Sequence, residues 1–147
     1  MKCYFGGIKK KKGSICNFLI SDFGFLHRNV VKYTDKLVIE FLSLLYLFEF
    51  ITSNSALFQE VSYIDIYGDA EVLHYLRKKK VPIKINPYKE SVMSYIGMNA
   101  KLKFQFFNIS KKANIAFFAA DYISVDPKTV QYVNTVMEAF KNDQDKN

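Results

Sequence analysis

The sequence has little of what marks several common classes of protein. It holds only two cysteines, Cys3 and Cys16, and neither has a second cysteine at the spacing of a zinc-ligand pair. A zinc site and a disulfide framework are therefore not indicated. We expect the two thiols to be small, reduced core residues, although pairing of the first two strands could also bring them together.

A small-molecule enzyme has no supporting motif, because no glycine-rich phosphate loop and no nucleophile with a convincing base occur.

Long hydrophobic runs are missing as well. The longest, residues 37–51, is interrupted by Glu40 and Glu49 and is shorter than a membrane span. The N-terminal residues turn glycine-rich at Gly6 and then lysine-rich, without an apolar run of signal-peptide length. No internal repeat or low-complexity linker appears. We therefore expect a soluble, intracellular protein that does not associate with a membrane.

What the sequence does have is apolar residues and positive charge. Half of the 147 residues are hydrophobic, including 14 Phe and 10 Tyr, which suffices for one substantial core. We predict a single domain over residues 1–142, followed by a polar tail at 143–147. The 21 Lys and Arg residues exceed the 14 Asp and Glu residues and give a net charge of +7. This excess favours a polyanionic partner, the alternative being a merely soluble basic protein.

The predicted elements follow a legible order. Short turns separate the first three strands, which makes them an antiparallel meander. The Thr34-Asp35 pair offers an N-cap for a helix so apolar that most of its surface must be buried. In chain order we predict strands at 2–5, 14–21 and 30–33, a helix at 35–52, a strand at 61–67, a helix at 70–79, a strand or extended connection at 81–85, a helix at 88–98, a strand at 102–107, and helices at 114–124 and 128–141. This is an α/β chain with a mixed sheet.

Four local patterns, in this order, resemble the ribonuclease H family. Residues 4–7 resemble its first hairpin, where the family ends a strand in Asp-Gly, and residues 39–44 resemble its Ala-Glu-Leu-x-Ala-Leu helix. Residues 66–73 resemble its strand-to-helix corner, Ile-Tyr-x-Asp-Ser-x-x-Val. Phe106, Phe107 and Asn114, followed by residues 120–124, resemble its last strand, its Asn and its Ala-Asp-x-Leu-Ala helix. The resemblance implies a ribonuclease H-like fold over residues 2–124.

The resemblance also implies a metal site. In the family, clustered carboxylates hold two divalent metals that activate water and stabilise the leaving oxygen, and Mg²⁺ or Mn²⁺ prefers such oxygen ligands. Carried over, the catalytic and metal-ligating residues are Glu40, Asp69 and Asp121. Gly6 stands where the family has its first carboxylate, and it has no side chain with which to bind a metal.

Two further departures concern the last part of the pattern. Asn114 precedes Asp121 by seven residues, whereas the family's spacing is about four. Residues 109–112 also occupy a loop in which family members often carry a histidine. His27 and His74 are expected in a turn and on the second helix, in ordinary surface or partly buried roles.

Each acidic residue also has a structural explanation. Glu40 could be a polar residue at the solvent edge of its helix, Asp69 a helix N-cap, and Asp121 an exposed helix residue. Asp65 shares a strand face with Tyr67, so it needs a partner such as Lys2 unless that face of the sheet is partly open.

The lysine runs suggest contacts with phosphates. If they flank one groove, they would bind a nucleic-acid backbone without reading its sequence; otherwise they are ordinary solvated charge. Exposed Tyr and Phe side chains could stack on unpaired bases. The candidate nucleic-acid-binding residues are Lys9, Lys10, Lys11, Lys12, Lys111 and Lys112, with the run at 77–80 as a possible addition.

Two functions follow from these residues. The first is a degenerate ribonuclease H-like domain that binds RNA, an RNA–DNA hybrid, or a ribonucleoprotein or replication assembly. The second is an active ribonuclease H-type endonuclease that depends on Mg²⁺ or Mn²⁺. The glycine at position 6 favours the first, because loss of one group from a concerted site weakens transition-state stabilisation strongly.

Overall fold

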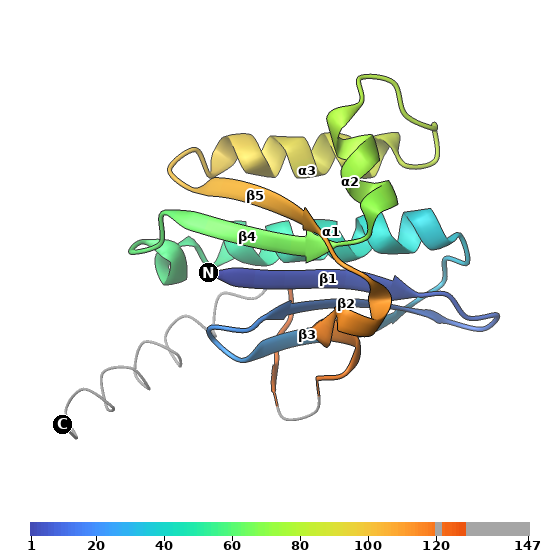
Figure 1. The fold of residues 1–147 in the computed structure, drawn as a ribbon, viewed down its shortest axis with the longest axis horizontal. Helices are drawn as coiled ribbons and strands as arrows, with labels where there is room; N and C mark the ends of the chain where they lie inside the picture. Colours follow the sequence, from blue (N-terminus) through green and yellow to red (C-terminus); the bar gives the residue numbers. More distant parts are fainter. Residues whose placement is uncertain (120–121, 129–147) are drawn as a thin grey trace.

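In the part of the chain that the structure describes, the sheet has six strands, and a helical layer covers one of its faces (Figure 1). The structure, a computed structural model, describes residues 1–119 and 122–128. Its strands lie in the order β5-β4-β1-β2-β3-β6. Strands β1, β2 and β3 form the predicted antiparallel meander, and β4, β5 and β6 are parallel to their neighbours. The bounds are β1 (Lys2–Ile8), β2 (Ser14–Ile20), β3 (Phe25–Val31), β4 (Tyr63–Gly68), β5 (Lys103–Asn108) and β6 (Ile123–Ser124).

Helix α1 (Lys36–Ser53) lies across the sheet and is buried on most of its surface, as its sequence predicts. No helix of the described residues is long and apolar enough to cross a membrane. Helix α3 (Asn86–Met98) packs against α1, and the short helix α2 (Ala70–Arg77) lies next to β5. The other helical segments of the described residues are the 3₁₀ turns η1 (Ser55–Phe58), η2 (Lys111–Ala113) and η3 (Ile115–Phe117).

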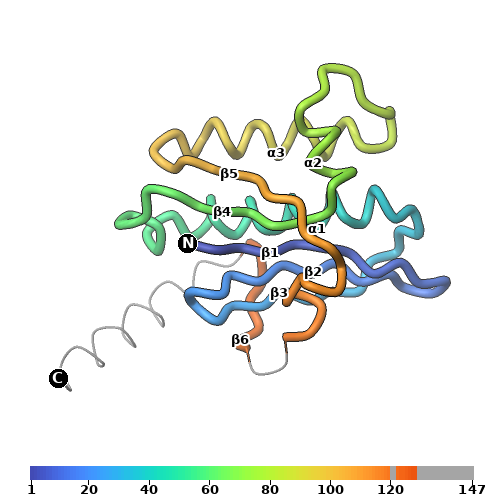
Figure 2. Tube along the Cα trace, in the orientation of Figure 1, coloured from blue at the N-terminus to red at the C-terminus, as the bar shows by residue number. Residues whose placement is uncertain are grey.

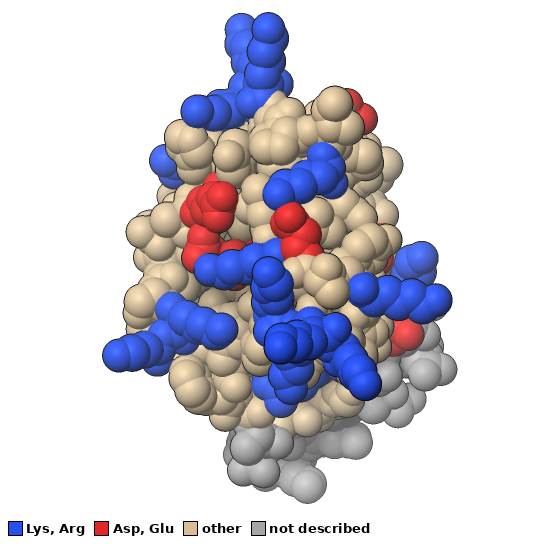
Figure 3. All heavy atoms as spheres, turned by 90° about the vertical axis from the view of Figure 1, so that its right-hand side faces the viewer, with Lys and Arg blue, Asp and Glu red and all other residues tan. Residues whose placement is uncertain are grey.

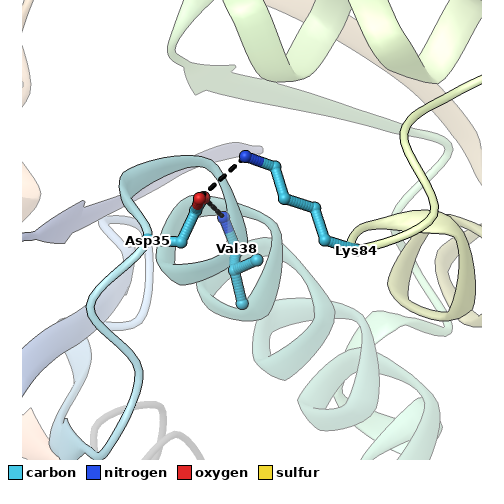
Figure 4. Close-up of polar contacts among 3 residues, drawn as sticks. All are labelled: Asp35, Val38 and Lys84. Carbon is cyan, nitrogen blue, oxygen red and sulfur yellow. Dashed lines mark hydrogen bonds and ion pairs between the residues drawn. The ribbon is translucent and has the colours of Figure 1, made fainter.

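The start of α1 is held by its N-cap, Asp35. The Asp35 Oδ1 atom accepts a hydrogen bond of 3.1 Å from the Val38 backbone N–H, and Oδ2 accepts one of 2.7 Å from Lys84 Nζ (Figure 4). The hydrogen bond from Lys84, together with that from Val38, holds the pKa of Asp35 below its usual range. Asp35 thus fixes the helix start and ties the loop before α3 to it.

Helix α1 approaches β1 so closely that Gly7 has no room for a side chain. A Cβ atom there would lie 2.3 Å from Ile39 Cγ2 and 3.2 Å from the Ile39 carbonyl carbon. Strand β1 and helix α1 cannot move apart here without a cost in packing energy, so a methyl group at Gly7 must distort the packing between them.

We therefore expect Gly7→Ala to lower the free energy of unfolding by about 2 kcal/mol. Gly97→Ala is the matched control, because a Cβ atom at Gly97 in α3 meets nothing within 4 Å. There the better helix propensity of alanine should raise stability by up to about 1 kcal/mol. Urea unfolding of both variants checks the pair, and equal effects at the two glycines would show that α1 does not lie this close to β1.

Four predicted elements differ from the structure. The first strand does not end at residue 5 but continues through Gly6 and Gly7 to Ile8, because all three residues pair with β2. The third strand is Phe25–Val31 rather than 30–33, because Gly24 turns with a φ of 68° and pairing resumes at once. Residues 81–85 form a turn around Pro82 instead of a strand. Residues 114–119 and 122–124 do not form the predicted helix; η3 and the strand β6 stand there, separated by residues outside the described ranges. The predicted helix at 128–141 and the tail at 143–147 lie outside the described residues, except for residue 128.

Both cysteines are buried and free, which confirms the prediction of small core residues. Although β1 and β2 pair, Cys3 lies opposite Ile20 and Cys16 lies opposite Gly7. The strand register therefore separates the two thiols along the hairpin.

Candidate functional site

The candidate site lies at one end of the sheet, where β1 and β4 run parallel and end side by side. Gly6 is near the end of β1, Asp69 follows β4 directly, and Glu40 lies about one turn inside α1. Carboxyl ends of adjacent parallel strands meet at one edge of a sheet, so topology alone brings these positions together. The right-hand side of Figure 1 is this end, and Figure 3 views it directly.

Glu40 is a buried residue and is only 6% exposed. It is therefore not a polar residue at the solvent edge of its helix, which was the structural alternative to a metal ligand. Burial, reinforced by the nearby charges of Asp69 and Glu71, raises the pKa of Glu40 to about 7. The ammonium groups of Lys36 and Lys111 act in the opposite direction. The site therefore holds a carboxyl group that is close to half protonated at neutral pH.

Asp69 is the N-cap of α2. Its Oδ1 atom accepts a hydrogen bond of 2.8 Å from the Glu71 backbone N–H. The N-cap explanation therefore holds for this oxygen, and the charge of Asp69 also contributes to raising the pKa of Glu40. A capping role and a place in the site are compatible.

The space above Gly6 is filled by an aromatic ring. A Cβ atom at Gly6 would lie 2.4 Å from Phe117 Cζ and 2.9 Å from Phe117 Cε2. The Lys111 Nζ atom lies 5.4 Å from the centroid of the same ring, the distance of a cation–π contact. Where the family resemblance places a carboxylate, this chain has a phenyl ring with an ammonium group beside it.

Asn114 holds Phe117 in place. Its Nδ2 atom donates a hydrogen bond of 2.8 Å to the Phe5 carbonyl, and its Oδ1 atom accepts one of 3.1 Å from the Ala116 backbone N–H. Arg28 Nη2 donates a hydrogen bond of 2.9 Å to the Ala116 carbonyl. These bonds satisfy backbone groups that a helix would have used, which explains the failure of the helix prediction here. Figure 2 shows the chain after β5 turning back over β1 and β2.

Phe117 and Arg28 were not expected at this site from the sequence. The only signal was the seven-residue spacing from Asn114 to Asp121, which leaves room for the η3 turn that carries the ring. Asp121 itself lies outside the described residues.

The described residues include only two of the three predicted metal ligands, Glu40 and Asp69, because Asp121 lies outside them. No group of three His, Cys, Asp or Glu side chains in residues 1–119 and 122–128 is arranged to hold a metal ion. The first-carboxylate position is filled by the Phe117 ring, and Lys111 already brings a positive charge close to Glu40. An ammonium group and a metal ion would compete for the same negative charge.

The basic residues surround this acidic pair. Figure 3 shows Lys and Arg side chains spread over this end of the molecule, with a few acidic side chains among them. The lysines at 9–12 are exposed in the β1–β2 hairpin, the run at 77–80 is exposed after α2, and Lys111 and Lys112 are exposed in η2. In chain order, the three segments follow β1, end α2 and follow β5.

His27 does not lie in a turn, and its surface or partly buried role was wrong. It is part of β3 and is 6% exposed, with its Nδ1 atom 3.1 Å from the Val125 carbonyl oxygen. Burial lowers the pKa of His27, so the ring is neutral. His74 is exposed on α2, as predicted.

Comparisons with known proteins identify the fold. No family model matches the sequence, and a search of curated proteins finds no significant match. Among solved structures, RNase H1 from the halophilic archaeon Halobacterium salinarum is 11% identical, with a TM-score of 0.57, covering 78% of this chain and 89% of that one. An N-terminal RNase H domain from Mycobacterium tuberculosis, solved as a fusion with maltose-binding protein, is 10% identical, with a TM-score of 0.55, covering 79% and 92%. The chain therefore has a ribonuclease H-like fold.

Proposed function

We propose that this chain is a nucleic-acid-binding domain of ribonuclease H-like fold whose hydrolytic site is degenerate. The observation that carries the proposal is the Phe117 ring above Gly6, the residue at which the resemblance puts the family's first carboxylate. Its partner is RNA, an RNA–DNA hybrid, or a ribonucleoprotein or replication assembly that contains one of these.

Phosphodiester cleavage by two metal ions requires clustered negative charge on the protein. Two metal ions are held together by carboxylates that approach them from several sides. Gly6 offers no side-chain oxygen ligand, and the Phe117 ring occupies the space into which a side chain at position 6 would project. Glu40 and Asp69 then form an acidic pair whose negative charge is already offset in part by the Lys111 ammonium group. Such a pair suits a protein surface without a metal ion better than a metal centre.

Binding is supported by the exposed lysines around the pair. Such contacts neutralise phosphates and release counterions, so affinity falls steeply with salt. A net charge of +7 adds attraction at long range. A nucleic-acid partner and two free, buried thiols also favour a location inside the cell.

Salt dependence tests the binding surface. The logarithm of the affinity for a blunt RNA–DNA hybrid should fall linearly with the logarithm of the salt concentration. Lys11→Gln and Lys112→Gln should each reduce the slope by about one, the value for one lost phosphate contact. Lys101→Gln is the control, because Lys101 is exposed in the turn before β5, at the other end of the sheet, and should leave the slope unchanged. Equal slopes for all three variants would argue against this surface.

The second candidate is an active, Mg²⁺- or Mn²⁺-dependent endonuclease, in which Glu40, Asp69 and Asp121 hold the metal. It is favoured by the retained acidic pair and by the raised pKa of Glu40, since perturbed carboxyl groups cluster at functional sites. Cleavage of the hybrid that disappears in Asp69→Asn would establish this function.

A further inference from the structure

We propose that the sheet face opposite α1 binds unpaired bases of single-stranded nucleic acid, which extend a stack of three rings, Tyr4, Tyr67 and Phe107. The inference rests on the proposed function. It adds a contact surface beyond the end of the sheet where Glu40 and Asp69 lie, which we call the acidic end. We call this set of three rings the aromatic row.

The aromatic row crosses three adjacent strands. In the strand register, Tyr67 of β4 lies beside Tyr4 of β1 and beside Phe107 of β5. The ring centroids of Tyr4 and Tyr67 are 5.0 Å apart with planes at 18°, and those of Tyr67 and Phe107 are 5.1 Å apart with planes at 23°. The three rings therefore form one offset stack across the strands.

The stack ends at a strand edge. In the described residues β5 is the last strand on this side of the sheet, and Phe107 is 40% exposed. The flat ring of a base can continue such a stack beyond Phe107. Stacking of this kind is tolerant of sequence, because every base has a π-face.

The aromatic row is continuous with the candidate site. Gly6 follows Tyr4 by two residues and so shares its strand face, and the Phe117 ring lies over Gly6. Asp69 follows Tyr67 by two residues and directly adjoins the end of β4. A strand that contacts the lysines of the acidic end can therefore continue onto the row.

Charge on this face suits a phosphate backbone. Lys103 Nζ lies 5.5 Å from the centroid of the Tyr63 ring, which is 51% exposed. Lys2 is exposed in the register position next to the half-buried Asp65. Gln105, exposed on the other side of Asp65, offers both a donor and an acceptor to a base edge.

The geometry selects unpaired bases. In a duplex the faces of the bases are stacked on one another, and only single-stranded segments can place a base against an aromatic side chain. The row therefore recognises a strand that leaves a duplex or a loop, while the lysines at the acidic end contact phosphates in either form.

The test uses the full chain and a fluorescein-labelled single-stranded RNA of twelve uridines, followed by anisotropy at fixed low salt. Phe107→Leu removes the ring but keeps an apolar side chain, and it should weaken binding by about tenfold. Phe107→Trp keeps a stacking surface and should bind at least as tightly. Because the sequence has no tryptophan, the new indole is also a unique reporter whose fluorescence a stacked base should quench. Met93→Ala, a change of an exposed residue on α3, is the control and should have no effect.

Binding of a blunt RNA–DNA hybrid, measured in parallel, distinguishes the aromatic row from the proposed function. If Phe107→Leu weakens single-strand binding and leaves hybrid binding intact, the aromatic row is established. If Phe107→Leu, shown to be folded by circular dichroism, binds the single strand as tightly as the unmodified protein, the inference is wrong while the proposed function stands. If the unmodified protein binds neither probe, both are wrong.

Discussion

Glu40→Gln is expected to stabilise the protein at pH 8, by about 3 kcal/mol. The folded-state pKa of Glu40 is raised to about 7 from an ordinary value near 4.5. Between these values the folded state binds more protons than the unfolded state, so the contribution of Glu40 to stability falls as pH rises. Above pH 7 the full cost of the buried charge is present, and a neutral amide of similar size removes it.

Urea unfolding of Glu40→Gln and of the unmodified protein between pH 4 and pH 8 checks this. The difference should be near zero at pH 4, grow through pH 5–7 and level off above it, because contributions from all other groups cancel between the two proteins. Glu71→Gln is the control, since Glu71 is exposed and should change stability by less than about 0.5 kcal/mol. A difference that does not vary with pH would show that Glu40 is not held in an unfavourable place.

Gly6→Asp should destabilise the protein by about 1–2 kcal/mol, and Phe117→Ala in the same chain should recover much of this loss. The new Cβ atom meets the Phe117 ring at 2.4 Å, and the new carboxylate joins Glu40 and Asp69 in a partly dry place. The smaller side chain at position 117 makes space for it and lets water enter.

The double variant also asks whether the site is a lost metal centre. With Gly6→Asp and Phe117→Ala together, position 6 gains a carboxyl group at the end of the sheet where Glu40 and Asp69 lie, and Mn²⁺ should raise the melting temperature. The unmodified protein and the single variant Phe117→Ala should show no such rise. A Mn²⁺-dependent shift of equal size in the unmodified protein would contradict the degenerate site.

The positions of Glu40 and Asp69 were predictable because each belongs to a local pattern. Glu40 lies in an apolar helix and Asp69 follows a strong strand, and both elements form where the sequence places them. For Asp65 the sequence left two alternatives, an ion pair with a residue such as Lys2 or a partly open sheet face. In the described residues the one ion pair is between Lys84 and Asp35, and the sheet face that carries Asp65 is partly open.

Phe117 and His27 were not predictable, because tertiary contacts determine their places. The apolar spacing after Asn114 resembles a helix, but hydrogen bonds from Asn114 to Phe5 and from Arg28 to Ala116 fix two tight turns instead. His27 is buried only because β3 starts early, at Phe25, and pairs with β6, a strand that the sequence did not indicate.

Binding and cleavage of one RNA–DNA hybrid, measured in the same samples, test the central claim most directly. The unmodified protein is mixed with a hybrid labelled at the RNA 5′ end, in low salt with Mg²⁺ or Mn²⁺, and both anisotropy and RNA length are followed. We expect salt-sensitive binding and intact RNA after prolonged incubation. Cleavage that requires the metal and disappears in Asp69→Asn would contradict the account and make this protein an active ribonuclease.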